Sequence, residues 1–145
     1  MNHPQTLAER LYEYFPNKQL KAIKDYACCI FTLLWCLGLE PEDDDAIIAV
    51  AKLMNKGIID EECTVYWQKA CEYLTGRKVS VDFVNITDIK KIKARTPVHY
   101  VYRGKGHWVG VENGKIKFNS LAHSVCVENG KPETMRVLNF TGGTK

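Results

Sequence analysis

The sequence lacks long apolar segments and a leader peptide. Its longest apolar stretch, residues 27–39, is shorter than the roughly 20 residues that a helix needs to span a bilayer. The first fifteen residues have neither the basic start nor the apolar core of a signal peptide. We therefore expect a cytoplasmic protein that does not cross a membrane.

The cysteine pattern excludes the common metal and redox motifs. Six cysteines occur in 145 residues, but no two form a CxxC pair and none lies in a Cys/His cluster with zinc-site spacing. A chain of this length can bury a sufficient core without disulfides. We expect reduced, mostly packed thiols and no metal or other cofactor.

Charge is unevenly distributed along the chain. Residues 1–76 carry 7 Lys/Arg against 12 Asp/Glu, a net charge of −5, and residues 77–145 carry 13 against 5, a net charge of +8. A basic half can bind nucleic acid. Its positive charges are spread along predicted strands, however, and Lys90–Arg95 is the only tight cluster. Nucleic-acid binding is therefore unlikely, and we expect a peptide or protein as substrate or partner. The oligomeric state is left open.

The first half of the chain has helical periodicity. Thr6 is a candidate N-cap with Glu9 three residues later, and Pro16 ends that helix. The chain restarts after Asn17. Further helices are predicted at residues 27–37, 41–57 and 61–76, the last two ending at glycines.

The second half alternates apolar and polar residues, as strands do. Predicted strands cover residues 78–86, 97–104, 107–113, 115–121 and 134–140. The Asn113-Gly114 pair is the strongest hairpin signal. We predict one α+β domain over 1–145, with helices in about 1–76 packed on an antiparallel sheet in about 77–141 that ends in a meander. The tail 141–145 should fray.

Two adjacent cysteines open the most apolar predicted helix. Cys28 and Cys29 are either small packed hydrophobes or include a nucleophile at a helix N-terminus, where the dipole favours thiolate. A nucleophile needs a base. His107 begins one strand of the predicted hairpin and Asn119 ends its partner, so the two lie side by side. The amide can then orient the imidazole while the other ring nitrogen faces a thiol.

The remaining histidines are weaker candidate bases. None begins a hairpin strand with a polar partner opposite, and His123 is the fallback because it follows the same hairpin; the others are His3 and His99.

The stretch GHWVGVENGKIKFNS (106–120), together with a Cys opening the apolar helix in 25–38, resembles the papain-like cysteine peptidase superfamily. It is especially similar to the small bacterial branch that includes the double-glycine leader peptidases, and to small bacterial and phage proteins whose helix opens Gly-Cys-aromatic-Phe. The resemblance implies a minimal papain-like fold with a Cys28–His107–Asn119 triad. Cys28 matches the motif position, whereas Cys29 would point about 100° away on the helix and suits packing better.

The chain departs from that family before the nucleophile. Papain-type enzymes carry a Gln there as an oxyanion-hole donor, and Ala22 lies closest to that place here. Gln19 and Lys21 are the candidate replacements, beside the backbone N–H of Cys28. Trp108 and Trp35 are candidate cleft residues, and both are also explained by packing.

These residues predict a thiol hydrolase, by default a cysteine peptidase or a related amide or isopeptide hydrolase. The alternative is a catalytically inactive papain-like domain that binds a protein or acts as an inhibitor. The missing Gln and the small size favour this alternative, because a scaffold can host several functions.

Overall fold

The computed structural model describes residues 1–141, so all but the first residue of the predicted frayed tail lies outside the described part. Five helices precede the first strand. They are α1 (Pro4–Tyr14), α2 (Lys18–Tyr26), α3 (Cys28–Cys36), α4 (Asp43–Asn55) and α5 (Trp67–Thr75). A short helix, α6 (Val125–Asn129), follows the fourth strand. The predicted order of helices before strands is confirmed.

Five strands form one antiparallel sheet in the order β1-β5-β2-β3-β4. The strands are β1 (Lys78–Asn85), β2 (Thr96–Tyr102), β3 (Lys105–Glu112), β4 (Lys115–Phe118) and β5 (Lys131–Thr141). The class α+β is therefore confirmed. The predicted terminal meander holds only for β2, β3 and β4, because β5 returns across the sheet and inserts between β1 and β2.

Local signals explain most of the helix ends. The Asn17 side chain accepts a hydrogen bond from the Leu20 N–H and caps α2. Three aspartates fill the first turn of α4, where the helix dipole favours negative charge. Gly76 ends α5 with φ +69°, in the left-handed region that glycine adopts without strain.

Two predicted helix starts are wrong. Helix α1 begins at Pro4 rather than after Thr6, because proline suits the first helical position and the Thr6 hydroxyl accepts from the Ala122 N–H instead. Helix α5 begins at Trp67 rather than near 61. The Asp60 carboxylate accepts from the N–H groups of two following residues, and this turn replaces the expected helical start.

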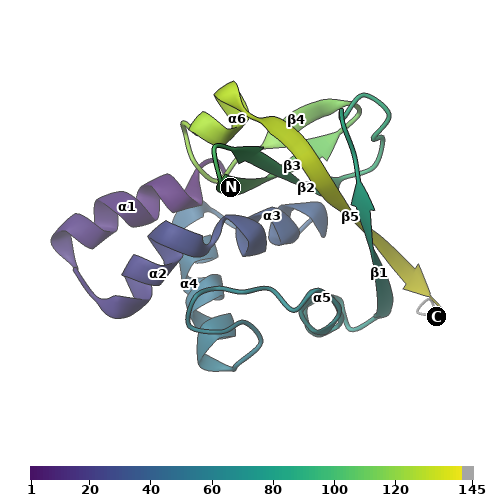
Figure 1. Ribbon diagram of the computed structural model, residues 1–145. Coiled ribbons are helices and arrows are strands. Elements are labelled where there is room, and N and C mark those ends of the chain that lie inside the picture. Colours follow the sequence, from purple (N-terminus) through teal and green to yellow (C-terminus); the bar gives the residue numbers. More distant parts are fainter. Residues whose placement is uncertain (142–145) are drawn as a thin grey trace.

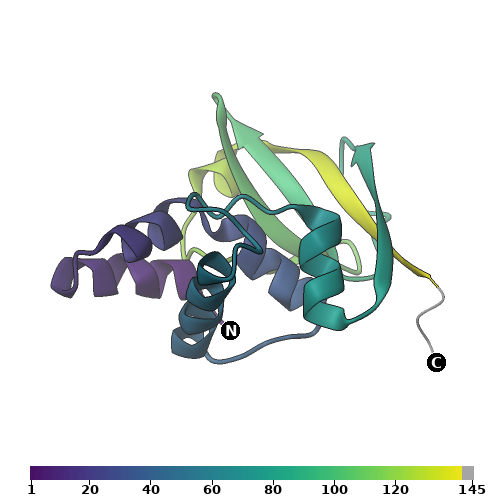
Figure 2. The ribbon, with the colours of Figure 1, turned by 90° about the horizontal axis from the view of Figure 1, so that it is seen from below.

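The sheet separates two apolar clusters. Helices α1–α5 lie on one side of it and α6 on the other (Figure 1). Helix α3 runs against β3 and β2, behind the more exposed helices, as the view from below also shows (Figure 2). Gly110 permits this approach, because a Cβ there would collide with the Trp35 ring. The helix that opens with Cys28 is thus seated directly on the strand that carries His107.

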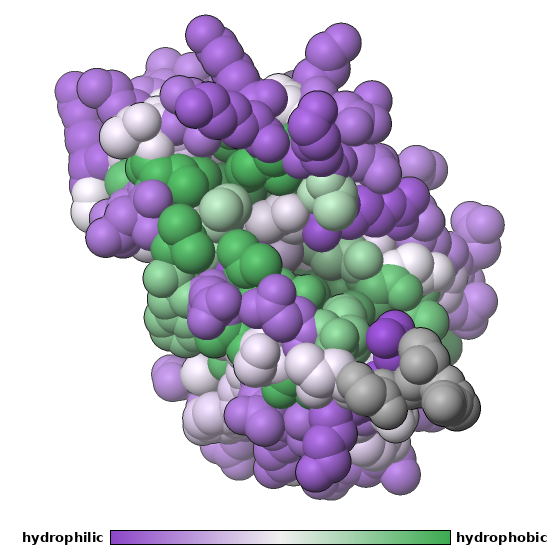
Figure 3. Space-filling model, turned by 90° about the vertical axis from the view of Figure 1, so that its right-hand side faces the viewer, coloured by the Kyte–Doolittle hydropathy of each residue, from purple (hydrophilic) through white to green (hydrophobic). Residues whose placement is uncertain are grey.

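The outer side of β1 and β5 carries a band of apolar side chains bordered by polar ones (Figure 3). Phe83 of β1 has the strand parity of Val79 and Val81 and so lies on the helix side of the sheet, where it is 67% exposed and its ring centroid is 3.7 Å from the Arg136 guanidinium. Within residues 1–141, no helix has the length and apolar character needed to cross a bilayer.

Candidate functional site

The β3–β4 hairpin brings His107 and Asn119 into contact. Asn113 (φ +53°) and Gly114 (φ +74°) form its turn, the left-handed pair that suits a tight hairpin. The hydrogen bond between His107 Nε2 and Asn119 Oδ1 measures 2.6 Å. His107 is only 4% exposed. The predicted proximity of His107 and Asn119 is therefore present in the fold, with a register shift between Gly110 and Val111 of β3 that adds one residue to β4.

This hydrogen bond determines which histidine nitrogen carries the proton. Asn119 Oδ1 also accepts from the Leu121 N–H at 3.0 Å, which identifies that atom as the amide oxygen. The Nε2 of His107 must then be the donor, and its Nδ1 carries the lone pair in the neutral ring. Asn119 thus leaves His107 Nδ1 as the nitrogen that can accept a proton.

The Cys28 side chain lies beside the backbone that follows His107. Strand β4 pairs only with Gly110–Glu112 of β3, so the earlier part of β3 has no partner on that edge. There the Trp108 carbonyl accepts from Thr32 Oγ1 of α3 at 3.3 Å. Cys28 is one helical turn before Thr32 and shares its face. Among residues 1–141, no hydrogen bond joins the Cys28 thiol to His107.

Burial keeps both groups of the candidate pair neutral. It raises the pKa of the Cys28 thiol, and hydrogen bonding from the backbone of Trp108 and of Cys29 and Cys28 themselves opposes this only in part. It also lowers the pKa of His107, against the effect of the Asn119 bond and with a smaller contribution from His99. Both shifts favour the neutral forms, a thiol at Cys28 and an uncharged imidazole at His107.

The two adjacent thiols have different surroundings. Burial raises the pKa of Cys29 well above its usual value, and the neighbouring thiols Cys28, Cys36 and Cys71 add to this while Arg136 opposes it. Cys29 has no contribution from the Trp108 backbone. Of the two, Cys28 is therefore the one placed next to the start of β3.

Both cysteines line a cleft of about 350 Å³. Its other lining residues include carboxylates, a third thiol and aromatic rings: Asp25, Tyr26, Glu62, Cys63, Thr64, Val65, Trp67, His99, Gly106 and Trp108. Trp108, a predicted cleft residue, lies in the cleft wall and packs against Trp67 with the rings tilted and their centroids 5.2 Å apart. His107 is not among the lining residues.

His99, which sequence reasoning ranked below His107, lies in the cleft wall. It pairs with Trp108 in the β2–β3 register, whereas His107 pairs with Tyr100, so the two histidines project from opposite faces of the sheet. The His99 ring is 4.9 Å from the Trp108 ring, and its Nδ1 is 3.5 Å from Glu133 Oε1. Only the strand register, which the sequence leaves open, places His99 here.

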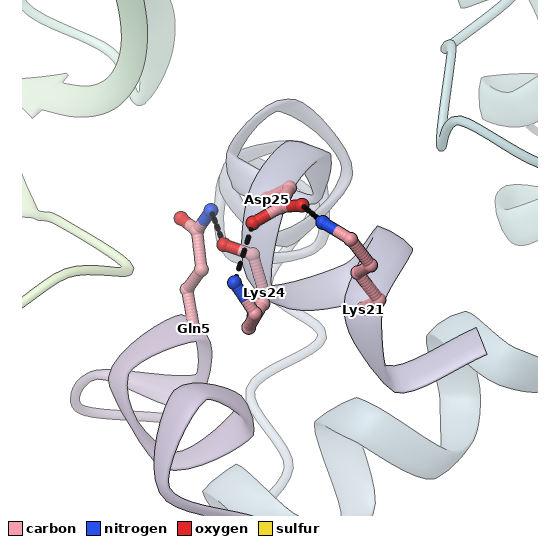
Figure 4. Close-up of polar contacts among 4 residues, drawn as sticks. All are labelled: Gln5, Lys21, Lys24 and Asp25. Carbon is pink, nitrogen blue, oxygen red and sulfur yellow. Dashed lines mark hydrogen bonds and ion pairs between the residues drawn. The ribbon is translucent and has the colours of Figure 1, made fainter. Parts of the chain in front are cut away.

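The two predicted oxyanion donors are engaged elsewhere. Gln19 Nε2 donates to Asn55 Oδ1 at 3.1 Å and reaches the Ala51 carbonyl at 3.5 Å, both on α4. Lys21 Nζ pairs with Asp25 at 2.7 Å (Figure 4). Neither residue lines the cleft.

Trp35, the second predicted cleft residue, is a core residue. It is 4% exposed and stacks on Phe118 at 6.1 Å between ring centroids, with the Arg95 guanidinium 4.3 Å from its ring centroid. Trp35 comes about two helical turns after Cys28 on α3, and it is not one of the residues that line the cleft. Packing therefore explains Trp35.

The other histidines have no place beside the thiols. His123 is 91% exposed at its side chain and faces Glu128 at 3.8 Å. His3 Nδ1 lies 2.9 Å from the Asn119 carbonyl oxygen. Across residues 1–141, no cluster of three or more His, Cys, Asp or Glu side chains is arranged to hold a metal ion.

No family model, curated protein or solved structure matches the chain. The papain-like resemblance and the catalytic roles of Cys28, His107 and Asn119 therefore stay predictions, and the function is argued from the geometry of these residues.

Proposed function

We propose that this protein is a thiol hydrolase in which Cys28 is the nucleophile, His107 the base and Asn119 the residue that orients the base. The observation that carries the proposal is the 2.6 Å hydrogen bond between His107 Nε2 and Asn119 Oδ1. It leaves Nδ1 as proton acceptor in the residue next to Trp108, whose backbone adjoins the Cys28 thiol. Nucleophile, base and orienting group are the three parts such a site needs.

The reaction begins from the neutral pair. Cys28 Sγ attacks the substrate carbonyl carbon while His107 Nδ1 takes the thiol proton. The tetrahedral intermediate expels the amine, which leaves with that proton, and a thioester forms on Cys28. Water then attacks the thioester, giving one proton to His107, which returns it to the departing Cys28 thiolate. The backbone N–H of Cys28, in the first turn of α3, stabilises the oxyanion.

The substrate class is an amide, isopeptide or thioester, with a peptide bond as the default. The cleft supports a peptide substrate, since its lining offers both carboxylates and aromatic rings for contact with peptide side chains. We place the reaction in the cytoplasm, because all six cysteines are free thiols and a Cys nucleophile must stay reduced.

A second candidate function is an inactive papain-like module that binds or inhibits another protein. Two observations favour it: His107 does not line the cleft, and both predicted oxyanion donors are engaged elsewhere. The same fold would then present the cleft to a partner without using the thiol.

Site-resolved alkylation separates the two functions. Iodoacetamide labelling would be followed by peptide mass spectrometry from pH 5 to 9 in wild type, His107→Ala and His99→Ala. For a hydrolase, Cys28 is labelled faster than Cys29 and Cys63, and the rate falls at least tenfold in His107→Ala but by less in His99→Ala. Equal Cys28 rates in all three proteins, with a midpoint near that of a free thiol, would favour the binding module.

A further inference from the structure

The segment before and within the first turn of α1 holds the loop that carries Asn119. The backbone N–H groups of Gln5 and Thr6 both donate to the Ser120 carbonyl, at 3.0 and 3.3 Å. Thr6 Oγ1 accepts from the Ala122 N–H at 2.9 Å. These contacts join positions more than 110 residues apart in the sequence, and they fix the chain immediately after Asn119.

Gln5 makes a second connection through its side chain. Its Oε1 accepts from Ser120 Oγ at 2.7 Å, and its Nε2 donates to the Lys24 carbonyl at 2.8 Å. Gln5 is 3% exposed and Ser120 is fully buried. One buried amide therefore bridges the loop after β4 and the end of α2.

The α2 end of this bridge lies directly before the nucleophile. Lys24 is in the last turn of α2, where carbonyl groups lack helical partners, and only Ala27 separates α2 from α3. Asp25 Oδ1 and Oδ2 pair with Lys24 and Lys21 at 2.8 and 2.7 Å in the same turn (Figure 4). The turn before Cys28 is thus stabilised by the Asp25 ion pairs and by the bond from Gln5 to the Lys24 carbonyl. The Gln5 side chain also connects this turn to Ser120, which follows β4.

We propose that Gln5 is a positioning residue that sets the placement of Cys28 relative to the His107–Asn119 pair. This proposal rests on the proposed function. A primary amide is suited to the role because it offers one acceptor and one donor to two elements at once, whereas Met of similar length offers neither. Loss of both side-chain bonds removes the bridge between the Asn119 loop and the Cys28 turn while the backbone contacts to Ser120 remain, and a small displacement of reacting groups has a large kinetic cost.

The test is a double-mutant cycle on Cys28 alkylation at pH 7. Wild type, Gln5→Met, His107→Ala and the double variant are labelled with iodoacetamide and read by peptide mass spectrometry. We expect Gln5→Met to slow Cys28 labelling about tenfold, and to have little further effect when His107 is already absent. Gln68→Met makes the same chemical change on α5, where Gln68 bonds only Glu72, and should leave the Cys28 rate unchanged.

The readouts separate positioning from general loss of structure. If Gln5 were merely structural, Gln5→Met would lower Tm and speed the labelling of buried Cys71 as well. A Cys28 rate equal to wild type in Gln5→Met, with its dependence on His107 intact, would overturn the positioning role alone. A Cys28 rate independent of His107 in the wild-type background would instead overturn the proposed function.

Ser120→Ala keeps the test decisive if Gln5→Met does not fold. It removes only the bond from Ser120 Oγ to Gln5 Oε1 and leaves the backbone contacts in place. A slower, His107-dependent Cys28 rate in Ser120→Ala supports the bridge. An unchanged rate overturns it.

Discussion

His107 and His99 occupy adjacent strands but opposite faces of the sheet, and they show two different environments for an imidazole. His107 is buried, has a 2.6 Å hydrogen bond to Asn119 and is absent from the cleft wall. His99 lies in the cleft wall, against the Trp108 ring, with its nearest carboxylate 3.5 Å away.

His107 is held by a short hydrogen bond but does not line the cleft, whereas His99 lines the cleft but lies 3.5 Å from its nearest carboxylate oxygen. A base must present a defined nitrogen, and the Asn119 amide oxygen gives His107 that definition, whereas the His99–Glu133 separation exceeds the ordinary N–H···O distance of about 3.2 Å. His99 has the better contact with the cleft. Under the proposed function, we therefore expect His107 to transfer the proton and His99, in the cleft wall, to contact the substrate.

The largest expected effect is at Cys28, the proposed nucleophile. Cys28→Ala should reduce hydrolysis of a mixed fluorogenic peptide library by at least about 10³-fold while leaving Tm within a few degrees, because the thiol contributes chemistry more than packing. Cys29→Ala should retain most activity. A loss confined to Cys29→Ala would exchange the roles of the two thiols.

Replacing each of the two histidines should lower the rate of hydrolysis to a different extent. Loss of a general base lowers the rate of hydrolysis about 10²–10⁴-fold, so we expect a decrease in that range for His107→Ala. His99→Ala should lower the rate about tenfold or less, mainly through a change in KM. Steady-state kinetics on the same peptides provide the measurement. The reverse ranking would make His99 the base and His107 a structural residue.

Asn119 should have a smaller effect, exerted through His107. Asn119→Ala leaves the His107 Nε2–H buried without its acceptor, which costs roughly 1–3 kcal/mol of stability. We expect kcat to fall about 10- to 100-fold. Activity in the His107→Ala background should not fall further when Asn119→Ala is added, and additive losses would contradict an orienting role.

The smallest expected effect is on stability against pH. The folded pKa of His107 is lowered by burial, so below about pH 6.5 the unfolded chain binds a proton that the folded protein resists. The free energy of unfolding should therefore decrease as the pH falls from 7 to 5. Urea unfolding of wild type and His107→Gln at both pH values measures this, and an equal decrease in the two proteins would show that His107 is not its source.

The hairpin that carries His107 and Asn119 was predictable from the sequence only in part. The turn at Asn113-Gly114 depends on residues a few positions apart, and it brings the two ends of the hairpin together. The register shift between Gly110 and Val111, which adds one residue to β4 and puts Asn119 on the His107 face, was not predictable. The apolar run after Cys28 similarly predicted α3, because an all-round apolar helix must be buried.

The parts that join distant segments were not predictable in this way. Trp35 was a cleft candidate, but the seating of α3 on Gly110 places it in the core. The bridge from Gln5 to Ser120 spans 115 positions, and no local pattern marks either residue as a partner of the other. His99 lies in the cleft wall because the β2–β3 register pairs it with Trp108, and the sequence does not give that register.

The sequence by itself determined the α+β class, the helix that begins at Cys28 and the hairpin that turns at Asn113-Gly114, because each depends on short-range propensity and period. The tertiary structure alone decided that β5 inserts between β1 and β2, that α3 lies along the free edge of β3 and that Gln5 ties the Asn119 loop to the Cys28 turn. These arrangements depend on how segments remote in the sequence pack together and hydrogen-bond each other's buried polar groups, and local sequence patterns do not specify such contacts.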